Sequence, residues 1–260
     1  MPTDARPRDF DLVSFDCYGT LIDWESGILA AMQPVISRHE LFSSADDVLQ
    51  AYARAESAVQ AGAYRPYREV LRRTFAAMAK DLGFAPQADE LETLVEALPR
   101  WEPFHDTIAG LRALRAAGHR LAIISNDDDD LFAATTRALV FDVDAVVTAA
   151  MTRCYNPSPD ILERAFEVFG LPPQRILHAA QSRFHDIVPA RRLGMQTVHV
   201  VRDSGRASAV PDPDPATAPA SDPATAPSTA PATAPSGDPS ALEADWSVPD
   251  LAGLVTLLGA

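Results

Sequence analysis

Short runs of apolar, β-prone residues alternate with helical segments along most of this chain. Five runs are typical of buried strands: residues 11–15, 120–125, 144–148, 175–179 and 196–201. Three helical segments lie between or before the later strands: residues 106–117, 158–169 and 187–193. Strands that alternate with helices of this length predict βαβ units and a parallel sheet.

A helical block interrupts this alternation between the first and second strands. No segment from residue 24 to residue 103 has the pattern of a strand. Ser44 and Asp47 form a capping-box pattern that predicts a helix start. Pro66 suits the first turn of a further helix, which Gly83 ends. The block therefore predicts an all-helical domain inserted into the sheet domain.

Residues 205–240 repeat the elements Pro-Ala-Thr-Ala-Pro and Ser-Thr-Ala-Pro with almost no large apolar residue. Such a segment cannot offset its own ordering entropy, so we predict an Ala/Thr/Pro-rich disordered loop. Residues 244–258 then have the pattern of a last strand, a turn and a helix. The predicted fold class is α/β, a Rossmann-like parallel sheet flanked by helices with an inserted helical cap. The expected domains are an α/β core at residues 1–23, 104–204 and 241–260, and a cap at 24–103.

Polar side chains gather at the carboxyl ends of the predicted strands, where open parallel sheets bind ligands. They are Asp16, Tyr18 and Thr20 after the first strand, Ser125 and Asn126 after the second, Asn156 after the third, and Ser182 to Asp186 after the fourth. Because side chains alternate along an extended segment, Asp16 and Tyr18 share a face and Cys17 points into the core. Cys17 is therefore interpreted as a packing residue rather than a second nucleophile. The sequence predicts a site centred on the Asp16 carboxylate.

Composition narrows the classes of partner. The 260 residues carry a formal charge of -14, which argues against nucleic acid and against an anionic membrane surface. Two cysteines without a C-x-x-C motif exclude a disulfide framework and a zinc cluster. No apolar run is long enough for a signal peptide or a membrane span, so a cytoplasmic location is expected.

Four segments resemble, in order, the four motifs of the haloacid dehalogenase superfamily. They are FDCYGTLID, IISND, YNPSPDILERAF and HAAQSRFHDIVPARRLGMQTVHVVR. The pattern Asp-x-Tyr-Gly-Thr, with Trp-Glu-Pro-Phe leading into the second motif, is similar to the L-2-haloacid dehalogenase branch. The resemblance covers nearly the whole chain outside residues 205–240, and it implies that the inserted helices are a cap domain.

The resemblance implies a two-step hydrolysis. Asp16 would displace halide from an (S)-2-haloalkanoic acid, and water would cleave the resulting aspartyl ester to release an (R)-2-hydroxy acid. Thr20 would orient Asp16, Asp186 would position or activate the water, and Asn156 completes the catalytic set. The implied substrate-binding residues are Cys17, Tyr18, Ser125, Asn126 and Arg183. The implied partner is a small carboxylic acid with no cofactor, and apolar stripes on the cap helices are compatible with a homodimer.

A magnesium phosphatase is the first alternative. Phosphatases of the superfamily carry a second Asp two residues after the nucleophile and a Gly-Asp pair that holds Mg²⁺. Here those positions are Tyr18 and the pair Gln181 and Ser182. A phosphoryl group needs its charge neutralised, whereas halide leaves without a proton or a metal. Mg²⁺ is therefore expected only under the phosphatase alternative.

Asn156 stands where the family has a Lys, so a charge that keeps the nucleophile ionised and balances the substrate is missing. Arg153 and Arg183 are candidates for a substitute cation. Arg54 and Arg65 are candidates for the arginine with which the cap of the family contacts substrate. A non-hydrolytic member that binds a small acid or a partner protein is the second alternative.

Two further groups of residues have simpler explanations. The acidic run Asp127 to Asp130 suggests a metal site, but it falls where a helix should begin, and acids there are stabilised by the exposed N–H groups. The histidines show no ligand spacing and receive no role. They are His39, His105, His119, His178, His185 and His199.

Overall fold

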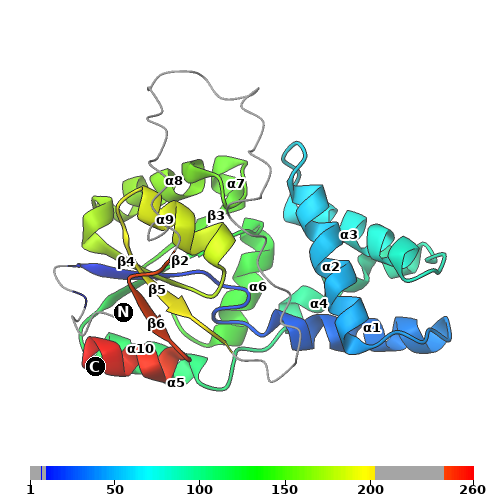
Figure 1. Ribbon diagram of the computed structural model, residues 1–260, viewed down its shortest axis with the longest axis horizontal. Helices are drawn as coiled ribbons and strands as arrows, with labels where there is room; N and C mark the ends of the chain where they lie inside the picture. The colour runs from blue at the N-terminus through cyan, green and yellow to red at the C-terminus, as the bar shows by residue number, and fades with distance from the viewer. Residues whose placement is uncertain (1–6, 8–9, 203–242) are drawn as a thin grey trace.

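A computed structural model describes residue 7, residues 10–202 and residues 243–260. Its centre is a six-stranded parallel sheet in the order β3-β2-β1-β4-β5-β6 (Figure 1). The strands are β1 (Leu12–Phe15), β2 (Arg120–Ser125), β3 (Ala145–Thr148), β4 (Ile176–Ala180), β5 (Gln196–Val200) and β6 (Trp246–Val248). All six strands that the sequence predicts are present, and the Rossmann-like parallel sheet is confirmed.

Helices cover both faces of this sheet (Figure 1). On one face lie α5 (Thr107–Ala116) and α10 (Leu251–Leu258), which pack against each other. On the other face lie α8 (Pro159–Phe169) and α9 (Val188–Arg192). The remaining core elements are α6 (Asp129–Leu139), α7 (Ala149–Thr152), η3 (Pro173–Arg175) and η4 (Arg183–Ile187). The carboxyl ends of β1, β2 and β4 lead into segments that carry Asp16, Asn126 and Asp186.

The two central strands, β1 and β4, are buried along their whole length. Strands covered on both faces need near-continuous apolar sequence, which is why the pattern of residues 11–15 was readable. Two polar side chains interrupt it. Ser14 and His178 are opposite each other in the β1–β4 register and share a hydrogen bond of 2.9 Å between Oγ and Nδ1. This buried pair lies directly beneath the strand ends.

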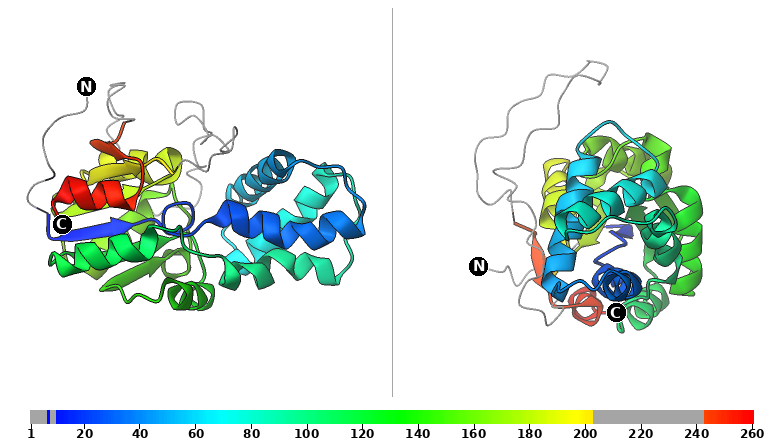
Figure 2. Two further views of the ribbon diagram at one scale, coloured as in Figure 1. Left: turned by 90° about the horizontal axis from the view of Figure 1, so that it is seen from below. Right: turned by 90° about the vertical axis from the view of Figure 1, so that its right-hand side faces the viewer.

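A helical lobe stands between β1 and β2 in the sequence and beside the sheet in space (Figure 1; Figure 2, left). It contains α1 (Trp24–Arg38), α2 (Ala45–Gln60), α3 (Tyr67–Asp81), η1 (Asp89–Glu92), α4 (Thr93–Ala97) and η2 (Leu98–Arg100). The structure has no strand between residues 24 and 100, all of which it describes. The predicted capping box of Ser44 and Asp47 is formed, and Pro66 immediately precedes α3.

Two glycines shape the connection between the sheet and the helical lobe. Gly19 has a φ of 98°, a left-handed conformation that favours glycine, and its N–H donates to the Ile22 carbonyl at 2.8 Å. Gly27 lies on α1, where a Cβ would stand 2.2 Å from Cδ1 of Trp101. Only a hydrogen atom fits there, so the Trp101 indole packs directly on the helix.

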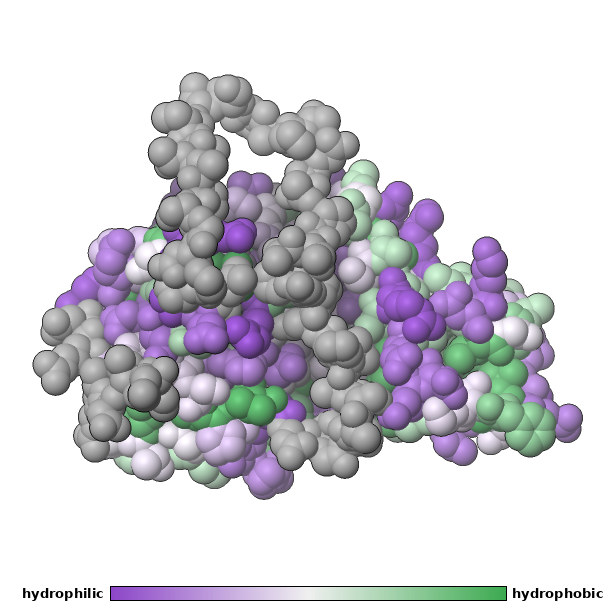
Figure 3. Space-filling model, in the orientation of Figure 1, coloured by the Kyte–Doolittle hydropathy of each residue, from purple (hydrophilic) through white to green (hydrophobic). Residues whose placement is uncertain are grey.

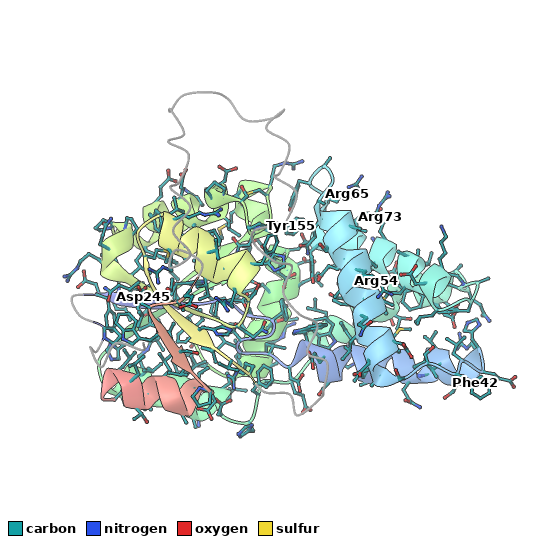
Figure 4. The ribbon with its side chains drawn as sticks, in the orientation of Figure 1. Phe42, Arg54, Arg65, Arg73, Tyr155 and Asp245 are labelled. Carbon is teal, nitrogen blue, oxygen red and sulfur yellow. The ribbon has the colours of Figure 1, made fainter. Side chains whose placement is uncertain are left out.

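The face of the helical lobe seen in Figure 3 carries many hydrophilic residues. Apolar residues gather at its far end, where Phe42 is fully exposed in the loop after α1 (Figures 3 and 4). Within the described residues, no helix combines the length and apolar character that crossing a membrane requires. The predicted loop at residues 205–240 lies outside the described residues.

Candidate active site

A cavity of about 850 Å³ lies where the carboxyl ends of the strands meet the helical lobe. The core contributes Asp16, Tyr18, Asn126 and Asp186 to its wall. The lobe contributes a second set of polar and aromatic side chains, among them Trp24, Tyr52, Glu56 and Tyr67. The structure therefore brings together side chains from three strand ends, as alternation along the chain indicated.

Asp16 follows β1 directly and is held by Thr20. The Thr20 hydroxyl donates to Oδ2 of Asp16 at 2.7 Å, and it accepts from the Gln181 backbone N–H at 2.9 Å. Thr20 is itself fully buried. Because the Thr20 hydroxyl is fixed from both sides, it holds Oδ2 of a carboxylate that lines the cavity. The hydrogen bond is the one through which the family resemblance implies that Thr20 orients Asp16.

The pKa of the Asp16 carboxyl is raised well above its usual range, chiefly because burial disfavours its charge. The nearby Asp186 carboxylate raises this pKa further, whereas the Thr20 hydrogen bond and the Cys17 backbone N–H lower it. The two largest of these influences, burial and Asp186, both raise the pKa. Asp16 therefore becomes a better nucleophile as the pH rises through its pKa.

Asp186 sits in η4 and is linked through Asn156 to Asn126. The Asn156 side-chain amide donates to Oδ1 of Asp186 at 3.1 Å, and the Asn156 backbone N–H donates to Oδ1 of Asn126 at 2.8 Å. Asn156 is buried, and its own Oδ1 has no hydrogen-bond partner among the described residues. Asn156 thus positions a carboxylate and an amide on the cavity wall without adding charge.

His178 stands behind Asp186 and was missed in the sequence. Its Nε2 lies 3.5 Å from Oδ1 of Asp186, too long for a good hydrogen bond. Burial lowers the pKa of His178 to about 4, although the Asp16 charge opposes this. His178 is therefore neutral near pH 7 and does not replace the missing cation. The signal in the sequence was a histidine inside an otherwise apolar predicted strand.

Tyr18 lies on the cavity side and Cys17 on the core side, as predicted from alternation. The Tyr18 hydroxyl donates to Oδ2 of Asp127 at 2.6 Å and is 2.8 Å from Oγ1 of Thr135. Burial raises the pKa of Asp127 to about 7, against the Tyr18 hydrogen bond that lowers it. Cys17 is fully buried in the hydrophobic core and does not line the cavity.

Most of the other candidate residues do not line this cavity. Ser125 is fully buried, its Oγ has no partner among the described residues, and it does not line the cavity. Arg183 is exposed and is also absent from the cavity wall. Arg153 stacks over the Tyr64 ring at 5.2 Å. Of the two candidate cap arginines, Arg54 lines the cavity, whereas Arg65 donates to the Ala63 carbonyl.

The acidic run after β2 serves the contact between core and lobe. Asp128 is the N-cap residue of α6, but its side chain accepts from the backbone N–H groups of Tyr67 and Arg68 at 2.8 and 3.0 Å. These groups open α3, whose own N-cap residue is a proline without a capping side chain. Arg68 also pairs with Asp130. The prediction that acids mark a helix start holds for α6, yet Asp128 caps a helix of the other lobe.

Tyr155 adds a second hydrogen bond between core and lobe. Its hydroxyl donates to the Arg65 carbonyl at 2.7 Å, and Figure 4 labels both residues. The Tyr155 ring lies against those of Tyr64 and Tyr67. Among the described residues there is no group of three or more histidines, cysteines or acids placed to hold a metal ion. The acidic run is thus engaged in protein contacts.

Replacing Asp128 with Ala should loosen the lobe. The change leaves two N–H groups of α3 without an acceptor and removes a charge at a helix N-terminus, so we expect a loss of about 1–2 kcal/mol in the free energy of unfolding. Urea denaturation measures it. Asp128→Asn, which keeps an acceptor oxygen, should recover part of the loss, and Asp142→Ala on the surface should change stability by less than about 0.5 kcal/mol. Equal losses for Asp128→Ala and Asp142→Ala would contradict the capping role.

Comparison with known proteins agrees with this geometry. The family model described as haloacid dehalogenase-like hydrolase matches residues 10–180. An (S)-2-haloacid dehalogenase of Xanthobacter autotrophicus is 29% identical over 199 residues, covering 76% of this chain and 77% of that protein. (S)-2-haloacid dehalogenase 1 of Pseudomonas sp. strain CBS-3 is 22% identical and covers 72% of this chain and 83% of its own.

Solved structures give the same fold. An L-2-haloacid dehalogenase has 25% identity and a TM-score of 0.69, covering 96% of this chain and 99% of its own. The X. autotrophicus L-2-haloacid dehalogenase with chloropropionic acid covalently bound has 23% identity and a TM-score of 0.73, with coverage of 96% and 99%. The family model, the relatives and the shared fold all point to one class of proteins, the hydrolases. This chain belongs to the haloacid dehalogenase-like hydrolase family.

Proposed function

We propose that the chain is an (S)-2-haloacid dehalogenase that works through an aspartyl-ester intermediate. The observation that carries the proposal is Asp16, fixed by Thr20 at the strand end that opens into the cavity. Relatives named as (S)-2-haloacid dehalogenases support the substrate class. The net reaction consumes one water and releases halide, a proton and the (R)-2-hydroxy acid.

In the first step the Asp16 carboxylate attacks the carbon that bears the halogen. The C–O bond of the ester forms as the carbon–halogen bond breaks, and the bonding pair leaves with the halide. Thr20 keeps Oδ2 in place, so the attack proceeds without a search over carboxylate rotamers. Asn126 lines the cavity with its oxygen already accepting from Asn156, which leaves its amide N–H groups to solvate the departing halide.

In the second step water attacks the carbonyl carbon of the Asp16 ester. Asp186 lines the same cavity and is held by the Asn156 amide, so its carboxylate is placed to accept the proton of that water. Release of the alcohol restores the Asp16 carboxylate. The oxygen of the product hydroxyl therefore comes from Asp16, and the water oxygen replaces it in the side chain.

The side chain at the position of the second acid favours displacement of halide over phosphate hydrolysis. The position of the second acid is Tyr18, whose hydroxyl is engaged with Asp127 and Thr135 and whose pKa burial raises well above its usual range. Tyr18 therefore keeps its proton at neutral pH, where it is a poor acid for a leaving alcohol. A halide leaving group needs neither this proton nor a metal, so we infer turnover without a cofactor.

Halide release from (S)- and (R)-2-chloropropionate in the presence of a chelator tests the proposal. We expect release from the (S) form alone, with the same rate when the chelator is omitted. Release of phosphate from phosphorylated metabolites that stops with the chelator would favour the phosphatase. Ligand-induced stabilisation without release of either ion would favour a non-hydrolytic binding protein.

The helical lobe is inferred to act as the cap of this site. It supplies half of the cavity wall and is tied to the core by Asp128 and Tyr155. A lobe held by a few hydrogen bonds to the segments after β2 and β3 can open to admit substrate and close to exclude water.

A further inference from the structure

The part of the cavity wall that comes from α2 and α3 carries a carboxylate between two tyrosines. Glu56 accepts at Oε1 from the hydroxyl of Tyr52 at 2.9 Å and from that of Tyr67 at 2.5 Å. The two hydroxyls are 3.3 Å apart. Tyr52 and Glu56 are one helical turn apart on α2 and so share a face, and Tyr67 begins α3. We call these three residues the Glu56 cluster.

Glu56 has capacity for a further donor. Both tyrosines bind the same oxygen, and among the described residues no side chain donates to Oε2 and no cation pairs with Glu56. Burial raises the pKa of this carboxyl, while the two hydroxyls lower it. A carboxylate taken out of water without a cation is costly, and a ligand that brings a positive charge would remove that cost.

The charges around the cavity disfavour a simple anion. Its described wall contains five carboxylates and two arginines. The carboxylates are Asp16, Asp23, Glu25, Glu56 and Asp186. Both arginines already face acids: Arg202 is buried and bonded to Asp106 at 2.6 Å, and Arg54 lies 3.5 Å from Asp81. Since Asn156 adds no positive charge, a negatively charged haloacid enters a cavity whose wall is rich in carboxylates.

Aromatic rings complete the surroundings expected for an ammonium group. Trp24 packs against Tyr52 with ring centroids 5.4 Å apart, and both residues line the cavity together with Tyr67 and Trp101. Aromatic faces attract cations, and a carboxylate beside them adds a charge-assisted hydrogen bond. The cavity, at about 850 Å³, also has room for a substrate much longer than a halopropionate.

We propose that the Glu56 cluster binds an ammonium group of the substrate, which is then a 2-haloacid with an amino group far from the reacting carbon. The identity of the substrate as a 2-haloacid rests on the proposed function. The binding of an ammonium group by the Glu56 cluster does not. Such a zwitterion carries its own positive charge into the cavity, which explains how the site works with asparagine where its family has lysine.

Binding is measured first, without turnover. Unhalogenated ω-amino acids of increasing chain length are titrated calorimetrically into the full chain, alongside carboxylic acids of the same length that lack the amine. We expect the best amino acid to bind at least about tenfold more tightly than its partner acid. Equal affinities across the series would overturn the proposal.

Variants then assign the preference to Glu56. Glu56→Gln keeps an oxygen for the two tyrosines but removes the charge, so the preference for the amine should disappear. Glu69→Gln is the matched control, because Glu69 is a surface residue of α3 paired with Arg73 and absent from the cavity wall. Ala53→Lys adds a cation to the same wall without touching the cluster, and it should also weaken amine binding. A preference that survives both Glu56→Gln and Ala53→Lys would overturn the assignment.

Halide release separates this inference from the proposed function. With 2-bromo acids that differ only in a terminal amine, the amine should lower KM in the parent. Glu56→Gln should raise KM for the amino acid and lower it for the plain acid, with smaller changes in kcat. A structural role for Glu56 would move both KM values in the same direction. Selective amine binding without halide release would contradict the proposed dehalogenase activity but would still support the ammonium site.

Discussion

Asp16→Asn is expected to reduce halide release by at least about a thousandfold, because the amide cannot displace halide or form the ester. The change is nearly isosteric, and the amide oxygen still accepts the Thr20 hydrogen bond that now holds Oδ2. The pKa of Asp16 is raised by burial and by Asp186, so loss of this charge relieves repulsion rather than creating strain. We therefore expect the variant to fold with unchanged or higher stability.

The matched control for this variant is Asp142→Asn, the same substitution on the exposed surface of the core. It should keep parental kcat and KM with (S)-2-chloropropionate. The measurement is initial-rate halide release together with the free energy of unfolding from urea denaturation. Full activity in a folded Asp16→Asn protein would show that the ester mechanism is wrong.

Asn156→Lys is expected to raise kcat/KM for plain haloacid anions roughly tenfold near pH 7. The new ammonium would lie beside Asp186, to which the Asn156 amide now donates at 3.1 Å, and close to Asp16. A positive charge there lowers the pKa of Asp16 and balances the substrate carboxylate. At an effective dielectric of about 20, one such contact is worth on the order of a few kcal/mol.

The pH profile distinguishes the charge from any change in packing. Because Asp16 reacts as the carboxylate and its pKa is raised, the parental rate should climb as the pH rises through that pKa. The lysine introduced by Asn156→Lys would lower the pKa, so the climb should occur at least about one pH unit lower. Asn156→Met, which places a side chain without charge at the same position, is the control and should leave the midpoint in place. Identical profiles for the Asn156→Lys and Asn156→Met variants would show that charge at this position does not limit the reaction.

The Asn156→Lys substitution also connects the proposed function with the ammonium site. The introduced lysine supplies from the protein the charge that the proposed substrate brings itself. Asn156→Lys should therefore improve turnover of the plain haloacid while reducing the advantage of the amine-bearing one. Equal increases in kcat/KM for the two substrates would favour a general effect on Asp16 alone.

The sheet and the strand-end residues could be predicted from the sequence because burial of a strand requires a continuous run of apolar residues. A strand covered on both faces is apolar until it leaves the core, so the first polar residues after it mark the site edge. Asp16 and Asn126 were found in this way, and both line the cavity. The helical lobe was readable for the same reason, since residues 24–103 lack any such run.

Contacts between residues far apart in the chain could not be predicted from the sequence. His178 meets Ser14 through the register of β1 and β4, which joins residues far apart in the chain, and no spacing rule gives that register. Asp128 looked like a cap for its own helix, yet it serves α3 because the lobe docks over it. Tyr52 and Glu56 looked like an ordinary pair on one helix face, and only the docking of the lobe turns that face toward Asp16.

The most direct test of the central claim is a single turnover in water labelled with the heavy oxygen isotope, with protein in excess over (S)-2-chloropropionate. If Asp16 forms the ester and water attacks its carbonyl carbon, the label appears in the peptide that contains Asp16 and the first product carries unlabelled oxygen. Label in the hydroxyl of the first product, with none in that peptide, would mean that water attacks the substrate directly and that Asp16 is not the nucleophile.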